Sequence, residues 1–185
     1  RRSVTRIMAI QAADKRSVSS DPLKGKRILV TRDRTQAKPL VQAIEALGGE
    51  GIEFPTIEIR PPDSYGPLDR AIEQIQTYDW LIFTSVNGVE RFLARFEELA
   101  KSLADLAGIE IVAIGPETAK RLEAAGVPPG LVPQLYQAEG ILETLAGKTL
   151  QGKKVLIPRA AKARDILPET LRRQGAQVDV VIAYQ

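Results

Sequence analysis

From residue 23 onward, short apolar runs alternate with segments of helical periodicity, and this alternation restricts the fold more than any other feature of the sequence. The runs "KRILVTR" and "DWLIF" have the length and the β-branched or aromatic content of buried strands. After the second run, Val89, Phe92 and Phe96 are spaced to form one apolar stripe on a helix. Repeated strand–helix alternation is typical of parallel sheets flanked by helices, so the predicted class is α/β.

The same patterns give bounds for the expected elements. Strands are predicted at residues 26–32, 51–59, 79–83, 109–115, 153–159 and 178–184. Helices are predicted at residues 37–49, 65–78, 86–99, 116–126, 138–147 and 164–175.

Two stretches of the chain resemble each other at an offset of 127 residues. "LKGKRILVTR" at 23–32 and "LQGKKVLIPR" at 150–159 share Leu, Gly, Lys, Leu and Arg, and the offset also pairs Gly48 with Gly175. A duplicated β-α-β unit explains the match; chance similarity is the alternative, because Gly-Lys before a strand is common. Units containing "FTS" and "IGP" follow the first copy, but no such units follow the second. We therefore expect that the sequence stops at Gln185 before a second pair of these units.

The sequence contains no Cys and no His. This excludes disulfides, thiol nucleophiles, thiolate zinc sites, Ser-His-Asp triads and imidazole proton transfer. Any catalysis must use carboxylates, hydroxyls, phenols, Lys, Arg or backbone groups. No apolar run approaches the roughly 20 residues of a membrane-spanning helix, so we expect a soluble protein. The absence of Cys fits a cytoplasmic location.

The net charge of +3 does not indicate a nucleic-acid partner. The chain has 26 Lys and Arg against 23 Asp and Glu, and five of the basic and two of the acidic residues lie at 1–22. The rest of the chain therefore holds 21 of each sign and offers no general attraction to a polyanion. Residues 1–22 are interpreted as a flexible tail or linker; a transit-peptide remnant or an added extension are the alternatives.

Three predicted strands end in loops that lead into helices, at 84–88, 115–119 and 158–165. In an open parallel sheet such loops gather at the carboxyl edge, where ligands bind. The free N–H groups of a helix's first turn and the helix dipole together attract anions. We therefore expect an anionic and moderately large ligand.

The candidate ligand contacts are short polar side chains and cations of these loops. They are Thr84, Ser85, Asn87, Thr118, Arg159, Lys162 and Arg164. Short hydroxyl and amide groups can donate hydrogen bonds without filling the space, and arginine can bind a carboxylate through two parallel bonds. The alternative for residues such as Thr84, Ser85 and Asp165 is that each caps its own helix.

Motifs for nucleotides and metals are incomplete or missing. "AGKT" at 146–149 resembles the end of a phosphate-binding loop, but Leu142 stands where Gly is needed and the segment follows a helix. No Gly-x-Gly-x-x-Gly follows a predicted strand, and carboxylates such as Asp69 and Glu97 are interpreted as solvated helix faces. The sequence therefore predicts no metal site and disfavours a nucleotide-dependent transferase.

Four motifs together resemble the uroporphyrinogen-III synthase family. They are "GKRILVTR", "LIFTSVNGVERF", "VAIGPETAKRLEAAG" and "LIPRAAKARDILPETLRRQGAQVDVVIAY", in this order. Each motif is weakly marked, but the order and spacing hold through residues 23–185. The resemblance implies two α/β lobes, each a parallel sheet flanked by helices, joined by a two-stranded connector with the active site between them.

On this sequence, the resemblance implies a discontinuous first lobe. Residues 23–59 would form its first β-α-β part, with the remainder beyond residue 185. Residues 60–62 would be a connector, 63–180 would form the second lobe, and 181–185 would lead back toward the first.

The resemblance also implies an activity and roles for particular residues. The family cyclises hydroxymethylbilane to uroporphyrinogen III, losing water and inverting ring D, without a cofactor. Tyr184 would assist the departure of the hydroxyl group, although a tyrosine that only packs in the connector is the alternative. Thr84, Ser85 and Thr118 would bind substrate carboxylates, and Gly115 would permit a close backbone approach.

Arg159 and Arg164 are substrate contacts in this interpretation, with a salt bridge to Asp165 or Glu169 as the alternative. The expected partner is the small-molecule tetrapyrrole, bound by a monomer that is fused to, or receives substrate from, neighbouring pathway enzymes. A plastid location applies if residues 1–22 are a transit-peptide remnant. The rival function is a non-catalytic two-lobed domain that binds or senses a small anion.

Overall fold

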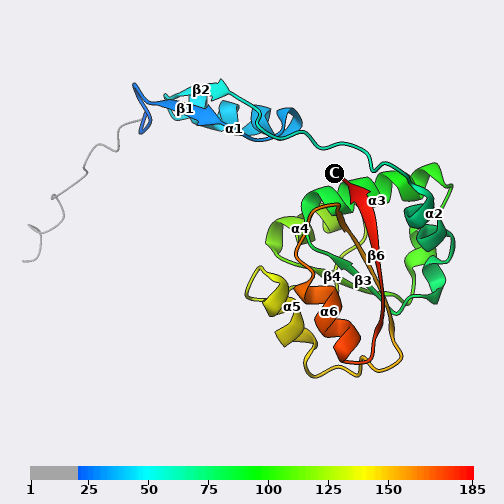
Figure 1. Ribbon diagram of the computed structural model, residues 1–185. Coiled ribbons are helices and arrows are strands. Elements are labelled where there is room, and N and C mark those ends of the chain that lie inside the picture. The colour runs from blue at the N-terminus through cyan, green and yellow to red at the C-terminus, as the bar shows by residue number, and fades with distance from the viewer. Residues whose placement is uncertain (1–20) are drawn as a thin grey trace, which may run out of the picture. The chain divides into compact units, whose positions relative to one another are not determined.

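The computed structural model describes residues 21–185, which form two compact units (Figure 1). The boundary between the units falls between Ile59 and Arg60. We call residues 21–59 the N-terminal unit and residues 60–185 the C-terminal unit, and each is described by itself. Residues 1–22, read from sequence as a tail or linker, lie almost wholly outside the described residues.

The elements alternate between strand and helix, as the sequence predicts. The strands are β1 (Arg27–Val30), β2 (Glu50–Glu53), β3 (Trp80–Phe83), β4 (Glu110–Ala113), β5 (Lys154–Ala160) and β6 (Gln177–Tyr184). The α-helices are α1 (Arg34–Ala46), α2 (Gly66–Glu73), α3 (Val86–Glu98), α4 (Pro116–Ala124), α5 (Ala138–Leu145) and α6 (Ile166–Arg173). Two short 3₁₀ helices are η1 (Ile75–Thr77) and η2 (Leu103–Leu106).

The N-terminal unit is a single β-α-β motif in which β1 and β2 pair in parallel. Its buried core consists of Val30, Ala37 and Ile44. β2 ends at Glu53 rather than at the predicted residue 59, because Pro55 has no N–H group for a sheet hydrogen bond. The opposite face leaves large apolar side chains exposed, including Leu29 and Phe54.

The C-terminal unit is a four-stranded parallel sheet in the order β4-β3-β5-β6, with helices on both faces. Figure 1 shows α2 and α3 on one side of the sheet and α5 and α6 on the other. Side chains alternate accordingly: Leu81 and Phe83 of β3 face α2 and α3, whereas Trp80 and Ile82 face α5 and α6. Both faces of this sheet are therefore buried, which explains why its strands are almost continuously apolar.

The structure confirms the internal repeat at an offset of 127 residues. β1 and β5 begin at Arg27 and Lys154, and the pairing of Arg27 with Glu50 is repeated as Lys154 with Gln177. Gly48 and Gly175 both adopt positive φ, 80° and 88°, where each terminates the helix of its copy. The two copies differ in the loop before the helix, which is longer in the second copy.

The predicted α/β class with parallel sheets and flanking helices is confirmed. Residues 181–184, which the resemblance assigned to a connector, still pair with β5 as the end of β6. Within residues 21–185, no helix has the length and apolar character required to cross a membrane.

Candidate ligand site at the carboxyl edge of the sheet

The three loops that the sequence singled out leave adjacent parallel strands. Phe83 of β3 pairs with Ala113 of β4, and Leu81 of β3 pairs with Leu156 of β5. The loops after β3, β4 and β5 therefore emerge at one edge. The chain passes from β3 to β4 on one side and from β5 to β6 on the other, so β3 and β5 form the topological switch point where open α/β sheets bind ligands.

Ser85 occupies the position between β3 and α3. Its backbone is extended, with φ −166° and ψ 156°, and the Gly88 N–H donates to its Oγ at 3.0 Å. This is the N-cap arrangement that the sequence left open as an alternative role for Ser85. Gly88 is also needed for close packing, because a Cβ there would lie 3.2 Å from the Pro158 carbonyl oxygen.

Tyr184 reaches the same place because β6 contains a bulge. Arg159 pairs with Ile182 and Ala160 pairs with Tyr184, so Ala183 is one extra residue on β6. Strict alternation would turn Tyr184 to the α5 and α6 face with Ile182. The extra residue instead places Tyr184 against the core beneath α3, together with Ala183.

The Ser85 Oγ and the Tyr184 hydroxyl lie 3.0 Å apart and are half-buried. They are separated by 99 residues in sequence. Because the Ser85 oxygen already accepts the Gly88 N–H, its own proton can be donated to Tyr184, which leaves the phenol proton available to a ligand. The arrangement can therefore donate a proton or a hydrogen bond at the switch point.

The β4 loop brings Gly115 and Thr118 to the edge beside the β3 loop. Gly115 is the N-cap of α4, and a Cβ added to it would lie 3.1 Å from Cγ of Tyr136. The group that closely approaches Gly115 is thus the ring of Tyr136, which the sequence analysis did not single out. Thr118 is 4% exposed in the first turn of α4, so little of its side chain is open to a ligand.

The basic side chains of the β5 loop differ in their surroundings. Arg159 donates to the Arg164 carbonyl oxygen at 2.9 Å and pairs with the Asp165 carboxylate. Asp165 therefore binds Arg159 and makes no side-chain cap to α6. Lys162 and Arg164 are exposed beyond this pair. Thr84 and Asn87 are half-buried on either side of Ser85.

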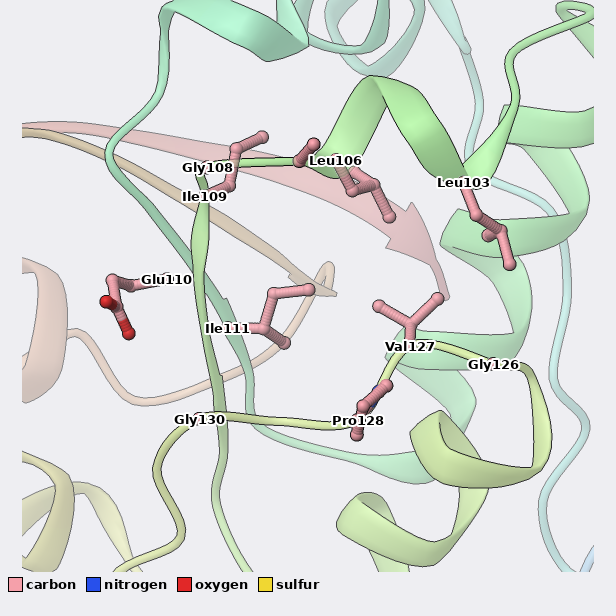
Figure 2. A pocket seen from close by; sticks show the side chains of 11 residues that line it. Leu103, Leu106, Gly108, Ile109, Glu110, Ile111, Gly126, Val127, Pro128 and Gly130 are labelled. Atoms are coloured by element: carbon pink, nitrogen blue, oxygen red, sulfur yellow. The ribbon is translucent and has the colours of Figure 1, made fainter.

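The hollow shown in Figure 2 lies at the other end of β4. It has a volume of about 440 Å³ and is lined by η2, the start of β4 and residues 126–130. Its side chains are apolar apart from Glu110, whose carboxylate points away from Leu106 and Val127. It contains none of the candidate residues, and no group of three possible metal ligands occurs within residues 21–185.

Fold and site together define an open, doubly wound α/β protein with a candidate ligand site at the switch point of its sheet. A family model described as uroporphyrinogen-III synthase HemD matches residues 38–185. The chain belongs to the uroporphyrinogen-III synthase family, which confirms the resemblance seen in the four sequence motifs.

Curated relatives agree with this assignment. The uroporphyrinogen-III synthase of Synechococcus elongatus is 37% identical over 169 residues, which cover 91% of this chain and 63% of the relative. The porphyrin biosynthesis protein HemD of Ruminiclostridium josui is 32% identical over 88% of this chain and 32% of the relative. The chain thus spans less than two thirds of the length of each of these relatives.

Solved structures show the same fold. A crystal structure of a mutant uroporphyrinogen III synthase from Thermus thermophilus superposes with a TM-score of 0.64 at 19% identity, covering 86% of this chain and 62% of that chain. The wild-type Thermus thermophilus enzyme superposes with a TM-score of 0.59 at 25% identity, covering 86% and 61%.

Proposed function

We propose that the protein acts as a uroporphyrinogen-III synthase, converting the linear tetrapyrrole hydroxymethylbilane into cyclic uroporphyrinogen III with loss of water and inversion of ring D. Family membership supports the class of reaction. The observation that carries the residue-level proposal is the 3.0 Å contact between the Ser85 and Tyr184 hydroxyls at the carboxyl edge.

The reaction requires little from acid–base groups and much from positioning. The hydroxyl on ring A leaves as water once it is protonated, and the electron-rich pyrrole stabilises the resulting carbon as an azafulvene. The substituted position of ring D attacks that carbon, and the spiro intermediate fragments and recloses at the unsubstituted position with ring D inverted. Loss of the proton from that position restores the pyrrole and replaces the proton that left with the water. Because the free bilane closes without inversion, the protein must hold the two ends in the geometry that favours the substituted carbon. No cofactor is needed.

In this proposal Tyr184 donates its phenol proton to the departing hydroxyl. The Ser85 hydroxyl donates to the Tyr184 oxygen, so it stabilises the negative charge that develops there. The Gly88 N–H in turn donates to Ser85, which fixes the serine oxygen at the first turn of α3. This chain of donors ends at the helix N-terminus, where the helix dipole also favours negative charge.

The polar groups around this pair would hold the carboxylates of the substrate. They are Thr84, Asn87, Arg159 and Arg164. Thr118 and Gly115 are expected to contribute less, because the Thr118 side chain is 4% exposed and the Tyr136 ring covers Gly115. The Ser85 hydroxyl is used by Tyr184. Arg164 is exposed and Arg159 is already paired with Asp165, so we expect Arg164 to contribute more to substrate binding than Arg159.

We further propose the lobed organisation that the family implies, with residues 63–180 as one lobe and residues 23–59 as the first part of the other. Two backbone hydrogen bonds support a two-stranded connector. The Arg60 N–H donates to the Gln185 carbonyl at 2.7 Å, and the Gln185 N–H donates to the Arg60 carbonyl at 2.9 Å. We also propose a cytoplasmic monomer that takes its substrate from the preceding enzyme of tetrapyrrole synthesis.

The test is a product analysis. The protein, expressed at the full length that its gene encodes, is incubated with freshly prepared hydroxymethylbilane, and the uroporphyrinogen isomers I and III are separated. We expect isomer III to predominate. Binding of the bilane with only the spontaneous isomer I as product would contradict the proposal and favour a non-catalytic binding domain.

A further inference from the structure

The segment that carries Tyr136 follows β4 toward the carboxyl edge. The Gly130 N–H donates to the Ile111 carbonyl at 2.9 Å, and the Ala113 N–H donates to the Leu131 carbonyl at 3.0 Å. Leu131 forms a parallel bridge with Val112. Because the two stretches run in the same direction, the residues after Leu131 extend to the edge where β4 itself ends.

Two glycines leave room for this segment. A Cβ on Gly115 would lie 3.1 to 3.3 Å from three atoms of Tyr136, closer than ordinary van der Waals contact. A Cβ on Gly140 would lie 2.0 Å from the Leu135 carbonyl oxygen, which only a glycine avoids. The position of the Tyr136 ring on Gly115 therefore depends on residues from both α4 and α5.

The ring is open to solvent on its other side. Tyr136 is 64% exposed and its neighbour Leu135 is 50% exposed. Gly115 follows Ala113 by two residues just as Ser85 follows the paired residue Phe83, so the ring lies on Gly115 in the loop next to the one that carries Ser85. The fold thus presents an exposed aromatic face at the same edge of the sheet as the proposed reaction site.

We infer that Tyr136 is a substrate-contacting residue that stacks on a pyrrole ring of the bound tetrapyrrole, an inference that rests on the proposed function. An aromatic side chain has a large rigid surface and favours offset or edge-to-face contact with another ring. The hydroxyl and cationic groups of this edge can bind the carboxylates of the substrate. The Tyr136 ring adds a contact for the apolar pyrrole rings that lie between those carboxylates. Its role is to bind and orient the substrate, and the chemical step does not involve it.

The inference is tested by steady-state kinetics with hydroxymethylbilane in Tyr136→Ala and Tyr136→Phe. Loss of one aromatic stacking partner is expected to raise KM about tenfold in Tyr136→Ala and to change kcat less than about twofold. Tyr136→Phe keeps the ring and is expected to retain the parent KM within about twofold. Leu103→Ala, an exposed apolar residue at the opposite end of β4, is the matched control and should leave KM unchanged.

A second variant tests the position of the ring. Gly115→Ala displaces Tyr136 and is expected to raise KM in the parent protein but to add little in Tyr136→Ala. The inference is overturned if KM is unchanged in Tyr136→Ala, or if KM rises as much in Tyr136→Phe as in Tyr136→Ala. In either case, formation of isomer III by the parent protein would leave the proposed function standing. A parent protein that yields no isomer III overturns both.

Discussion

The Tyr184 hydroxyl is placed so that a change of one atom can test it. Its ring packs against the core beneath α3, and its oxygen contacts Ser85. Tyr184→Phe keeps the ring and removes the proton donor. We expect kcat for isomer III to fall between several-fold and about a hundredfold, at or below the lower limit of what a general acid usually contributes, with the thermal unfolding temperature unchanged. An unaltered kcat in a folded variant would remove Tyr184 from the mechanism.

The Oγ of Ser85 caps α3 and also contacts the Tyr184 hydroxyl, and Ser85→Ala removes both interactions. Loss of the N-cap should lower the free energy of unfolding by about 1 kcal/mol. Loss of the contact with Tyr184 should lower kcat, and this second effect should largely vanish in the Tyr184→Phe background.

Two further variants separate the roles of Ser85. Ser85→Thr keeps the hydroxyl and should restore most of both properties. Ser102→Ala is the stability control, because Ser102 contacts Asp105 at the start of η2 and lies outside the candidate site. If Ser85→Ala lowers kcat by the same factor in the parent protein and in Tyr184→Phe, Ser85 acts independently of the Tyr184 hydroxyl.

The sequence could predict the role of a residue only where that role depends on its neighbours in the chain. Ser85 was found because a polar residue between a strand and a helix is a local signal. The contact with Tyr184 was not predictable from spacing, since the bulge at Ala183 is visible only in the pairing of β6 with β5. Tyr136 gave no signal, because its importance depends on the absence of a side chain at Gly115, in another element.

At the scale of elements, Asp79 joins the starts of β3 and β5. Its carboxylate accepts from Lys153 Nζ at 2.7 Å and from the Lys154 N–H at 2.8 Å. The Lys153 hydrogen bond and then the Lys154 N–H hold the pKa of Asp79 below its usual value of 3.8. A carboxyl group with a lowered pKa in the folded state stabilises the fold above its unfolded pKa, and this contribution is lost as pH falls through the folded value.

We therefore expect Asp79→Asn to be less stable than the parent protein at pH 7 and closer to it as the pH falls below 3.8. Thermal unfolding across this range measures the difference. Glu117→Gln is the control, because its carboxylate pairs with Lys120 at the surface, where both side chains are largely exposed, so its loss should cost little. A stability difference between Asp79→Asn and the parent that stays constant from pH 7 to pH 3 would contradict the assignment.

Element types were predicted better than element ends. The sequence located every strand of the two sheets, because a buried parallel strand appears as a short apolar run and an amphipathic helix appears as apolar residues three or four positions apart. The ends of elements depend on single groups. Pro55 lacks the N–H that would continue β2. The helix predicted from residue 37 begins earlier, at Arg34, and includes Pro39. Strand order was not predictable, since all four strands of the larger sheet have similar apolar character.

At the scale of the whole molecule, the two units have cores of very different size. Among residues 21–185, the N-terminal unit has three buried core side chains, whereas the clusters of the C-terminal unit have 19 and 12. A small core buries too little apolar surface to offset the entropy of ordering the chain. The two copies of the internal repeat differ in how their apolar side chains are covered. Leu29 and Phe54 are exposed, but their counterparts Leu156 and Val181 are buried beneath α2 and α3.

This contrast leads to a prediction about local stability. In the 185-residue chain, amide hydrogens of β1 and β2 should exchange at least about a hundredfold faster than those of β3 and β5. Hydrogen exchange followed by mass spectrometry measures both groups in one sample, and the peptides of β3 and β5 serve as each other's control because they lie in one sheet.

The same measurement tests the proposed lobes. If the protein expressed at the full length of its gene carries elements that cover Leu29 and Phe54, as α2 and α3 cover their counterparts, exchange in β1 and β2 should slow markedly while β3 and β5 stay unchanged. Equal protection of both units in the 185-residue chain would mean that three buried side chains suffice for the N-terminal unit, and would remove the reason to expect such a covering. Slow exchange in β1 and β2 that appears only in the protein expressed at the full length of its gene would support the β-α-β motif as the first part of a lobe completed elsewhere in the sequence.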